Sequence, residues 1–171
     1  MSHNCLMKAT EPIRLDWLWA LVRALLGWTF VWAFLDKLFG LGKATPTSKA
    51  WIHGGSPTTA YLTNVKGPFQ GFFHGLAGQA WADWLFMIGL AGIGVGLVLG
   101  IVMRVTAVCG ALLLVFMWMA SLPISSNPFL DDHLIDALVV LGIGFTTLGW
   151  QFGLGRWWSG TPLVQRYPWL A

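Results

Sequence analysis

Three side chains suited to acid–base chemistry lie close together near residue 133. Asp132 and Asp136 are four residues apart, so on a helix they share one face, and His133 lies one turn before Asp136. Histidine titrates near neutral pH, and a carboxyl group in apolar surroundings has a raised pKa, so this group could hold and transfer protons. The same atoms could ligate a metal ion, but such short helical patches are common and we predict no metal site.

Two cationic residues within an apolar run are also candidates. Arg23 and Lys37 are fourteen residues apart, so at about 100° per residue they lie on one stripe of a helix. A charge at the centre of a membrane helix costs about 2.5–3.5 kcal/mol on insertion scales and therefore needs a partner or a function. We expect Lys37, His133 and Asp136 at the mouth of a pocket, with Arg23 deeper inside.

Two interpretations of these charges stay open. In the structural one, Lys37 pairs with Asp136, His133 is a ring at the membrane interface, and Arg23 reaches back toward the cytoplasm. In the functional one, the cationic groups hold an anion or a quinone carbonyl, while His133 and the carboxylates carry protons.

The composition defines the class of protein that positions these residues. The 171 residues are 56% hydrophobic and only 10% charged, whereas a soluble domain has roughly 25% charged residues. The net charge of +3 is too small and too scattered for a nucleic-acid-binding surface. These values exclude a soluble enzyme, a disordered tail and a nucleic-acid binder, and they predict a small integral membrane protein.

Segments long enough to cross a bilayer predict an all-α integral membrane protein built as a four-transmembrane-helix bundle. A hydrocarbon core about 30 Å thick needs roughly 20 helical residues. The segments that meet this length are residues 15–39, 84–103, 105–122 and 134–152. The long loop over 40–83 is expected to be extracytoplasmic, with short helices opening at Ser56-Pro57 and at Gly67-Pro68, the second carrying an apolar stripe of Phe69, Phe72, Phe73 and Leu76.

Smaller features refine this topology. Arg104 stands alone between the second and third segments and predicts a very short turn. Gly92, Gly96 and Gly100, at four-residue spacing, predict close helix packing rather than a dinucleotide fingerprint. The distribution of Lys and Arg predicts that both termini are cytoplasmic. We expect the membrane to be the plasma membrane of a prokaryotic cell.

Several ungapped segments resemble the DoxD/DoxX family of small four-helix membrane proteins, and the DoxD branch in particular. The segments are RALLGWTFVWAFLDKLFG from Arg23, WIHGGSPTTAYL (51–62), KGPFQGFFHGLAG (66–78), NPFLDDHLIDAL (127–138), GLGRWW (153–158) and VQRYPWL (164–170). The resemblance implies one DoxD-like membrane domain over residues 1–171. It also implies a subunit of thiosulfate:quinone oxidoreductase, which couples two thiosulfates to tetrathionate, reduces a membrane quinone and normally has a DoxA-like second subunit.

Site residues follow from combining the resemblance with the charges. Thiosulfate is a dianion that would arrive from the outer aqueous side, and quinone would approach between helices from the lipid. We expect catalytic roles for His133, Asp132 and Asp136, and substrate or quinone binding by Arg23, Lys37, His74 and Lys66.

The expected partners are the lipid bilayer, a quinone and a DoxA-like or other respiratory subunit, with no nucleic acid. The resemblance implies the membrane quinone as electron acceptor. The sequence carries no haem, iron–sulfur or flavin motif, so no bound redox cofactor is predicted. A non-catalytic assembly or anchoring subunit of a respiratory or membrane redox complex is the alternative.

Overall fold

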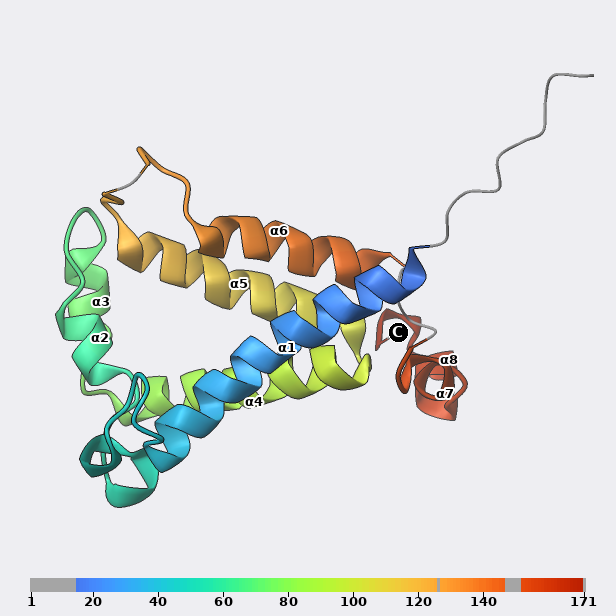
Figure 1. Cartoon of the computed structure of the whole chain (residues 1–171), viewed down its shortest axis with the longest axis horizontal. Helices are drawn as coiled ribbons and strands as arrows, with labels where there is room; N and C mark the ends of the chain where they lie inside the picture. Colours follow the sequence, from blue (N-terminus) through green and yellow to red (C-terminus); the bar gives the residue numbers. More distant parts are fainter. Residues whose placement is uncertain (1–14, 126, 147–151, 171) are drawn as a thin grey trace, which may run out of the picture.

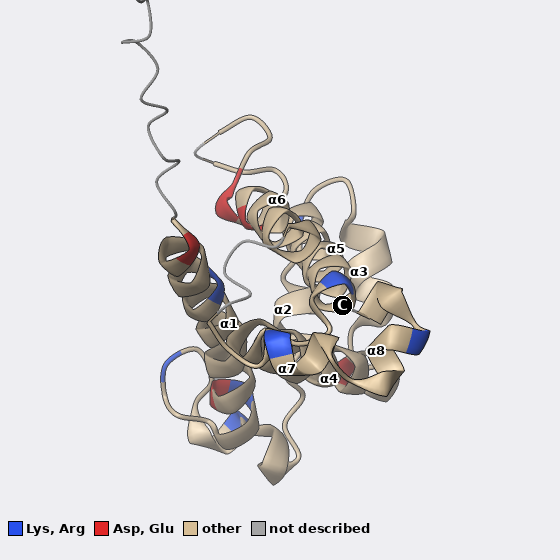
Figure 2. Ribbon diagram, turned by 90° about the vertical axis from the view of Figure 1, so that its right-hand side faces the viewer, with Lys and Arg blue, Asp and Glu red and all other residues tan. Residues whose placement is uncertain are grey.

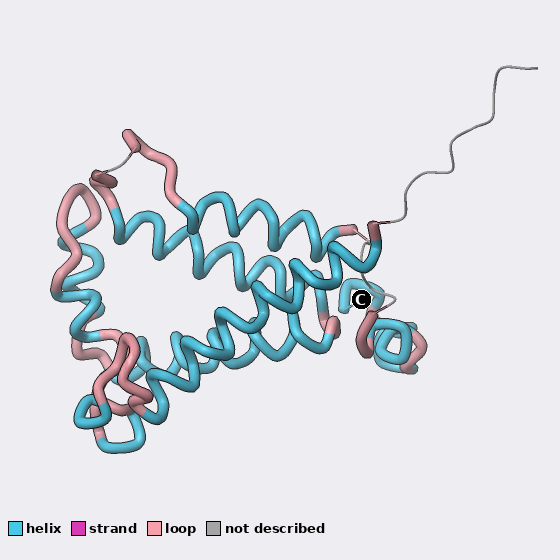
Figure 3. Tube along the Cα trace, viewed as in Figure 1, coloured by secondary structure: helices cyan, strands magenta, loops and turns pink. Residues whose placement is uncertain are grey.

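The structure is a computed structural model that describes residues 15–125, 127–146 and 152–170. Every regular element in these residues is a helix, as expected (Figure 3). Long helices make up the body of the molecule, and short ones lie in the connection after the first long helix and at the C-terminal end.

Two antiparallel helix pairs form this body. The pairs are α1 (Asp16–Phe39) with α4 (Ala80–Leu99), and α5 (Met103–Ser121) with α6 (Asp132–Phe145). Figure 1 shows that the pairs meet at the α4–α5 turn and diverge toward the opposite end of the molecule. There the short helices α2 (Thr59–Thr63) and α3 (Gln70–Leu76) bridge the opening.

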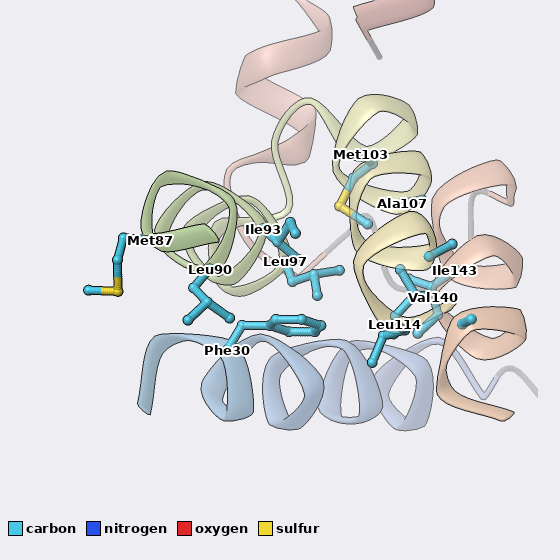
Figure 4. Packing of buried hydrophobic residues seen from close by; sticks show 12 residues of the cluster. Phe30, Met87, Leu90, Ile93, Leu97, Met103, Ala107, Leu114, Val140 and Ile143 are labelled. Atoms are coloured by element: carbon cyan, nitrogen blue, oxygen red, sulfur yellow. The ribbon is translucent and has the colours of Figure 1, made fainter. Parts of the chain in front are cut away.

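Apolar side chains from all four long helices form one core (Figure 4). Its most buried members come from α1, α4, α5 and α6, and those labelled in the figure are Phe30, Met87, Leu90, Ile93, Leu97, Met103, Ala107, Leu114, Val140 and Ile143. Full burial of one such side chain contributes roughly 1.5–3 kcal/mol, so this core is the principal contact between the two pairs.

The close approach of α1 and α4 depends on one glycine from each helix. A Cβ atom at Gly94 would lie 2.7 Å from Cγ2 of Val31, and one at Gly27 would lie 2.8 Å from the amide nitrogen of Val98. Neither position has room for a side chain, so both glycines are required by packing.

The predicted glycine stripe is only partly used. Gly96 packs directly on the side chain of Thr106 in α5, and Gly100 packs on Arg23. Gly92 has no other atom within 4 Å of the position of a Cβ, so the prediction of close packing is wrong there. It fails because Gly92 lies on the outward face of α4, which four-residue spacing by itself does not reveal.

The turn between α4 and α5 lies earlier than predicted. It consists of residues 100–102, because Gly100 ends α4 in the left-handed conformation (φ 73°) that a residue without a Cβ adopts easily. Arg104, which was expected inside the turn, belongs to the first turn of α5.

The loop over 40–83 contains more helix than predicted, in two 3-10 turns, η1 (Thr47–Lys49) and η2 (Trp51–His53), as well as α2 and α3. Helix α2 begins at Thr59 rather than at Pro57. The Ser56 hydroxyl accepts the N–H of Thr59 at 3.0 Å and donates to the Asp83 carboxylate at 2.9 Å. Asp83 also accepts the N–H of Thr58 at 3.2 Å, so this carboxylate fastens the loop to the start of α4.

Helix α3 begins at Gln70, and its apolar stripe is divided. Phe73 is buried in a second, smaller core, which Phe69 and Leu76 also contact. Phe72 is 51% exposed and stacks on Phe116 of α5, with ring centroids 6.3 Å apart. Helix α3 is therefore held against α5, where it covers the wide end of the molecule.

The C-terminal elements cover the narrow end, where α4 turns into α5. They are α7 (Gly155–Ser159), α8 (Pro162–Arg166) and the 3-10 turn η3 (Pro168–Leu170) (Figure 1). The N–H of Leu154 donates to the carbonyl of Leu99 at 2.9 Å, which joins this segment to the end of α4.

Three helices of the described chain, α1, α4 and α5, are long and apolar enough to cross a membrane. Their outward faces carry many exposed leucines, valines and tryptophans, which suits contact with lipid. The fourth predicted segment, 134–152, contains α6, which has 14 residues, and residues 147–151 of that segment lie outside the described residues.

Candidate functional site

A cavity of about 260 Å³ opens between α1 and α4 on one side and α5 and α6 on the other. Its polar side chains are Lys37 and Thr29 from α1 and His133 and Asp136 from α6. Its remaining walls are apolar and partly aromatic: Phe30, Ala33, Phe86, Leu90, Leu114 and Met117. The structure thus brings three of the predicted site residues to one space, which we call the Lys37–Asp136 cavity.

Lys37 is half-buried in this cavity. Its Nζ lies 5.8 Å from the centroid of the Phe86 ring, a cation–π distance. His133 pairs with Asp131 at 2.8 Å, and among the described residues no ion pair joins Lys37 to Asp136, so these two share a cavity without pairing. The ammonium group is consequently available to a ligand.

The neighbouring carboxylate, Asp36, binds the backbone of the loop over 40–83. It is 1% exposed and accepts the backbone N–H groups of Lys43 at 3.3 Å and Ala44 at 3.1 Å. These bonds fix the chain as it leaves α1 at the wide end of the molecule.

His133 is oriented by the residue that begins its helix. Its Nδ1 lies 2.8 Å from Oδ2 of Asp131, and the other oxygen of Asp131 accepts the N–H of Leu134 as the cap of α6. A carboxylate can only accept, so Nδ1 carries the proton and Nε2 is the nitrogen left for a ligand.

A second cavity, of about 150 Å³, lies under α2 and α3 and shares Lys37, Phe86 and Met117 with the first. Its other walls include Thr58, Tyr61 and Phe73. We call it the Tyr61 cavity. Because the two cavities share three side chains, Lys37 is within reach of a ligand in either.

The surroundings of Tyr61 shift the pKa of its phenol. Burial raises the pKa of Tyr61, a side-chain hydrogen bond with Ser121 opposes that shift, and the charge of Asp131 raises the pKa further. The phenol is therefore neutral near pH 7 and can donate a hydrogen bond. The hydrogen bond with Ser121 also joins α2 to the end of α5.

Arg23 lies outside both cavities, which corrects the prediction that it forms the deep end of the Lys37 pocket. It is 3% exposed, it lies against Gly100 and Gly153, and its Nη2 donates to the carbonyl of Phe152. Among the residues that the structure describes, its Nε and Nη1 find no hydrogen-bond partner. Fourteen helical residues span about 21 Å, so a shared helix stripe does not bring Arg23 near Lys37.

The other predicted residues lie apart from the cavities. Asp132 is exposed on the first turn of α6 and does not line the Lys37–Asp136 cavity. Lys66 is exposed, and the His74 ring, also on the surface, lies with Nε2 3.0 Å from the carbonyl of Val65. Their predicted roles are therefore not supported by a shared space, and for His74 the visible role is to hold the loop.

Sequence reasoning missed two residues of this region, Asp131 and Tyr61. Asp131 carried a usable signal, because an aspartate three residues before an apolar helical repeat is a typical N-cap. Tyr61 carried none, since only the folding of α2 over α5 brings a loop tyrosine beside Lys37.

Within the described ranges no group of three or more His, Cys, Asp or Glu side chains is arranged to hold a metal ion. The available donors here are instead an ammonium, an imidazole, a carboxyl and a phenol around apolar space. Such a set can hold a carbonyl-bearing ring and exchange protons with it.

Comparisons with protein-family models, with curated proteins and with solved structures find no match to this chain. The class of protein is therefore defined by its own features: an all-helical chain whose three long apolar helices indicate a multi-pass membrane protein.

Proposed function

We propose that this chain is the membrane subunit of a quinone-linked oxidoreductase and that the quinone ring binds in the Lys37–Asp136 cavity. The observation that carries the proposal is the meeting of Lys37, His133 and Asp136 in one otherwise apolar cavity between helices. A charged or titratable side chain next to lipid is costly, so three of them around one space favour a functional role over a structural one.

The walls suit the flat, mainly apolar ring of a quinone. Phe30, Phe86 and Met117 offer aromatic and thioether contacts, and the volume of about 260 Å³ is near the lower end of small-molecule sites. The ammonium of Lys37 would donate a hydrogen bond to one carbonyl oxygen. A hydrogen bond from a charged donor is worth roughly 1.5–3 kcal/mol, which would orient the ring.

Reduction of a quinone adds two electrons and two protons, and the protons go to the carbonyl oxygens. Asp136 and His133 line the cavity, and Asp131 holds the Nδ1–H of His133, so Nε2 would first take up a proton and then deliver it to a carbonyl oxygen. The His133 side chain is 31% exposed, so the proton for Nε2 would come from the aqueous side at the start of α6.

The proposed electron donor is thiosulfate, from the resemblance to the DoxD family. Two thiosulfate dianions join through a new sulfur–sulfur bond and release two electrons, which with two protons convert the quinone to quinol: 2 S₂O₃²⁻ + Q + 2 H⁺ gives S₄O₆²⁻ + QH₂. The proposal includes a DoxA-like second subunit or another respiratory subunit as partner.

The proposed topology has four spans in a prokaryotic plasma membrane, with both termini cytoplasmic and the loop over 40–83 outside. Helix α6 would begin the fourth span. Its 14 residues cover about 21 Å and would need further helical residues to cross a core about 30 Å thick. The support for α6 as a span is its apolar sequence and its packing along α5.

The test measures quinone binding and quinone reduction separately. Binding of a short-chain quinone to the purified full chain is followed by tryptophan fluorescence, and thiosulfate-dependent quinol formation is followed in proteoliposomes with candidate partner subunits. Lys37→Met should weaken quinone binding about 10- to 100-fold, from the loss of one charged hydrogen bond. His133→Ala and Asp136→Asn should lower the rate of quinol formation more than the affinity for quinone.

The matched control is Lys49→Gln, which removes an exposed charge from the outer loop and should change neither quantity. Equal quinone affinity in wild type and Lys37→Met would overturn the proposed site. Quinone binding at the cavity without any thiosulfate-dependent reduction would reject thiosulfate as donor and favour an assembly or anchoring subunit.

A further inference from the structure

Two apolar grooves lie side by side on the N-terminal half of α5. The first, of about 320 Å³, lies between α4 and α5, with Gly89 and Gly92 on its floor. The second, of about 410 Å³, runs from α5 to Phe145 and Trp169. Val105 and Cys109 line both, so the grooves are neighbours divided only by that ridge of α5.

A cationic residue, Arg104, lies at the second groove and next to Val105, which lines both grooves. Arg104 lines the second groove and lies in the first turn of α5, where no acidic residue occurs. Its Nη1 donates to the carbonyl of Pro168 at 3.3 Å, which holds the guanidinium beside Trp169. The free N–H groups of a helix N-terminus add partial positive charge at the same place.

The elements at the narrow end carry arginines on α5, α7 and α8, together with Asp16 in the first turn of α1. No Asp or Glu occurs in residues 84–130 or 137–171, while Arg104, Arg156 and Arg166 all lie in the elements at this end. Figure 2 faces this end and shows basic residues, in blue, on α7 and α8. Such a surface attracts anionic groups at the membrane interface.

We propose that this surface binds one anionic diacyl phospholipid, with its phosphate at Arg104 and the first turn of α5 and one acyl chain in each groove. Two apolar grooves beside one cationic group match a ligand with two apolar chains and one anionic head. Gly89 and Gly92 have no other atom within 4 Å of a Cβ position, so an acyl chain can lie directly against the α4 backbone there.

A second copy of this chain fits the surface less well. In a two-fold dimer within the membrane, the same patch of each protomer meets its own copy, so the two Arg104 side chains would be brought toward each other. The phospholipid supplies the opposite charge instead. The surface shares no residue with the Lys37–Asp136 cavity, so the inference is independent of the proposed function.

Native mass spectrometry of the delipidated full chain tests this inference. Phosphatidylglycerol should bind at least about tenfold more tightly than phosphatidylcholine with identical acyl chains. Arg104→Gln should remove most of that preference, whereas Gly92→Leu, which fills the first groove, should weaken both lipids about equally. Arg166→Gln is the control: it removes an exposed arginine at the same end that lines neither groove, and phosphatidylglycerol affinity should stay within about twofold.

A second measurement uses the exposed thiol of Cys109 in a Cys5→Ser background. Phosphatidylglycerol should slow modification of Cys109 by a maleimide at least threefold, and Arg104→Gln should abolish that protection. Equal affinity for the two lipids, displacement of phosphatidylglycerol by inorganic phosphate at similar concentration, or a protein dimer that Gly92→Leu dissociates would each overturn the proposal. Thermal unfolding of every variant shows whether it is folded.

Discussion

Replacing Gly100 by alanine tests where the guanidinium of Arg23 lies. Gly100 ends α4 with φ at 73°, and a Cβ atom there would overlap Nη1 of Arg23 and lie 2.8 Å from its Cζ. Alanine therefore has two costs. The backbone must hold a left-handed conformation with a Cβ present, and the buried guanidinium must move away from the carbonyl of Phe152.

The magnitude follows from these two terms. The left-handed conformation costs roughly 1–2 kcal/mol for an L-residue. Loss of a hydrogen bond from a charged donor costs about 1.5–3 kcal/mol. The two costs sum to about 2.5–5 kcal/mol. In a domain of this size, a loss of about 1 kcal/mol lowers the midpoint temperature of thermal unfolding by about 2–4 °C. Gly100→Ala should therefore lower the unfolding temperature by about 5–20 °C.

Two further variants separate the two terms. Gly42 has φ at 79° and no other atom within 4 Å of a Cβ position, so Gly42→Ala carries only the backbone cost, about 1–2 kcal/mol. Arg23→Met removes the guanidinium and leaves a flexible apolar chain. In that background Gly100→Ala should also cost only about 1–2 kcal/mol. The difference from its cost in the wild-type chain is a coupling free energy of about 1.5–3 kcal/mol between positions 23 and 100.

The assay is thermal unfolding of the detergent-solubilised full chain, followed by the near-ultraviolet circular dichroism of its 12 tryptophans. The reasoning is refuted by a cost of Gly100→Ala no larger than that of Gly42→Ala. It is also refuted by an equal cost with Arg23 and with Met at position 23, because the guanidinium would then not lie against Gly100.

Three further outcomes can be measured with the same unfolding assay. Asp131→Ala should lower the free energy of unfolding by about 1 kcal/mol, because α6 loses its N-cap and His133 loses the carboxylate that orients it. Asp132→Ala, at an exposed position, should change the free energy of unfolding by less than about 0.5 kcal/mol. Equal effects of the two substitutions would contradict the assignment of Asp131 as the cap. Gly94→Ala should cost about 1–3 kcal/mol because α1 leaves no room for a methyl group, while Gly92→Ala should be neutral or stabilising by up to about 1 kcal/mol, and a reversed order would contradict the packing. Because the pKa of Tyr61 is raised in the folded state, its contribution to stability is present below about pH 10 and is lost as the pH rises through the folded-state pKa. Tyr61→Phe should therefore make the unfolding temperature fall less steeply at alkaline pH. An unchanged slope would show that folding does not shift the pKa of this phenol.

Much of the secondary structure could be predicted from the sequence because it follows from local patterns. The three longest apolar runs form helices near the expected positions, and the apolar side chains around Phe73 recur at helical spacing. Boundaries were less accurate where backbone geometry decides them. Gly100 and Thr59 illustrate this, since one ends a helix earlier and the other begins one later than the residue types suggested.

The candidate site was only partly predictable for a related reason. Lys37, His133 and Asp136 were expected to share a pocket and do line one cavity. Arg23 was expected there too, but it lies near the start of α1 whereas Lys37 lies near the end, so the length of the helix keeps Arg23 away from the cavity. Tyr61 reaches this region through the fold of the loop over 40–83, which no local pattern encodes.

The sequence by itself determined the membrane environment and the helical secondary structure of this protein, because a chain with few charges and long apolar runs has few stable arrangements other than helices in a membrane. It also determined which titratable residues are costly enough to need a role. Only the tertiary structure decided which of them meet. Two helix pairs that touch at one end and diverge at the other place Lys37 beside Asp136 in a cavity and bury Arg23 beside Gly100, although both cations lie on the same stripe of α1.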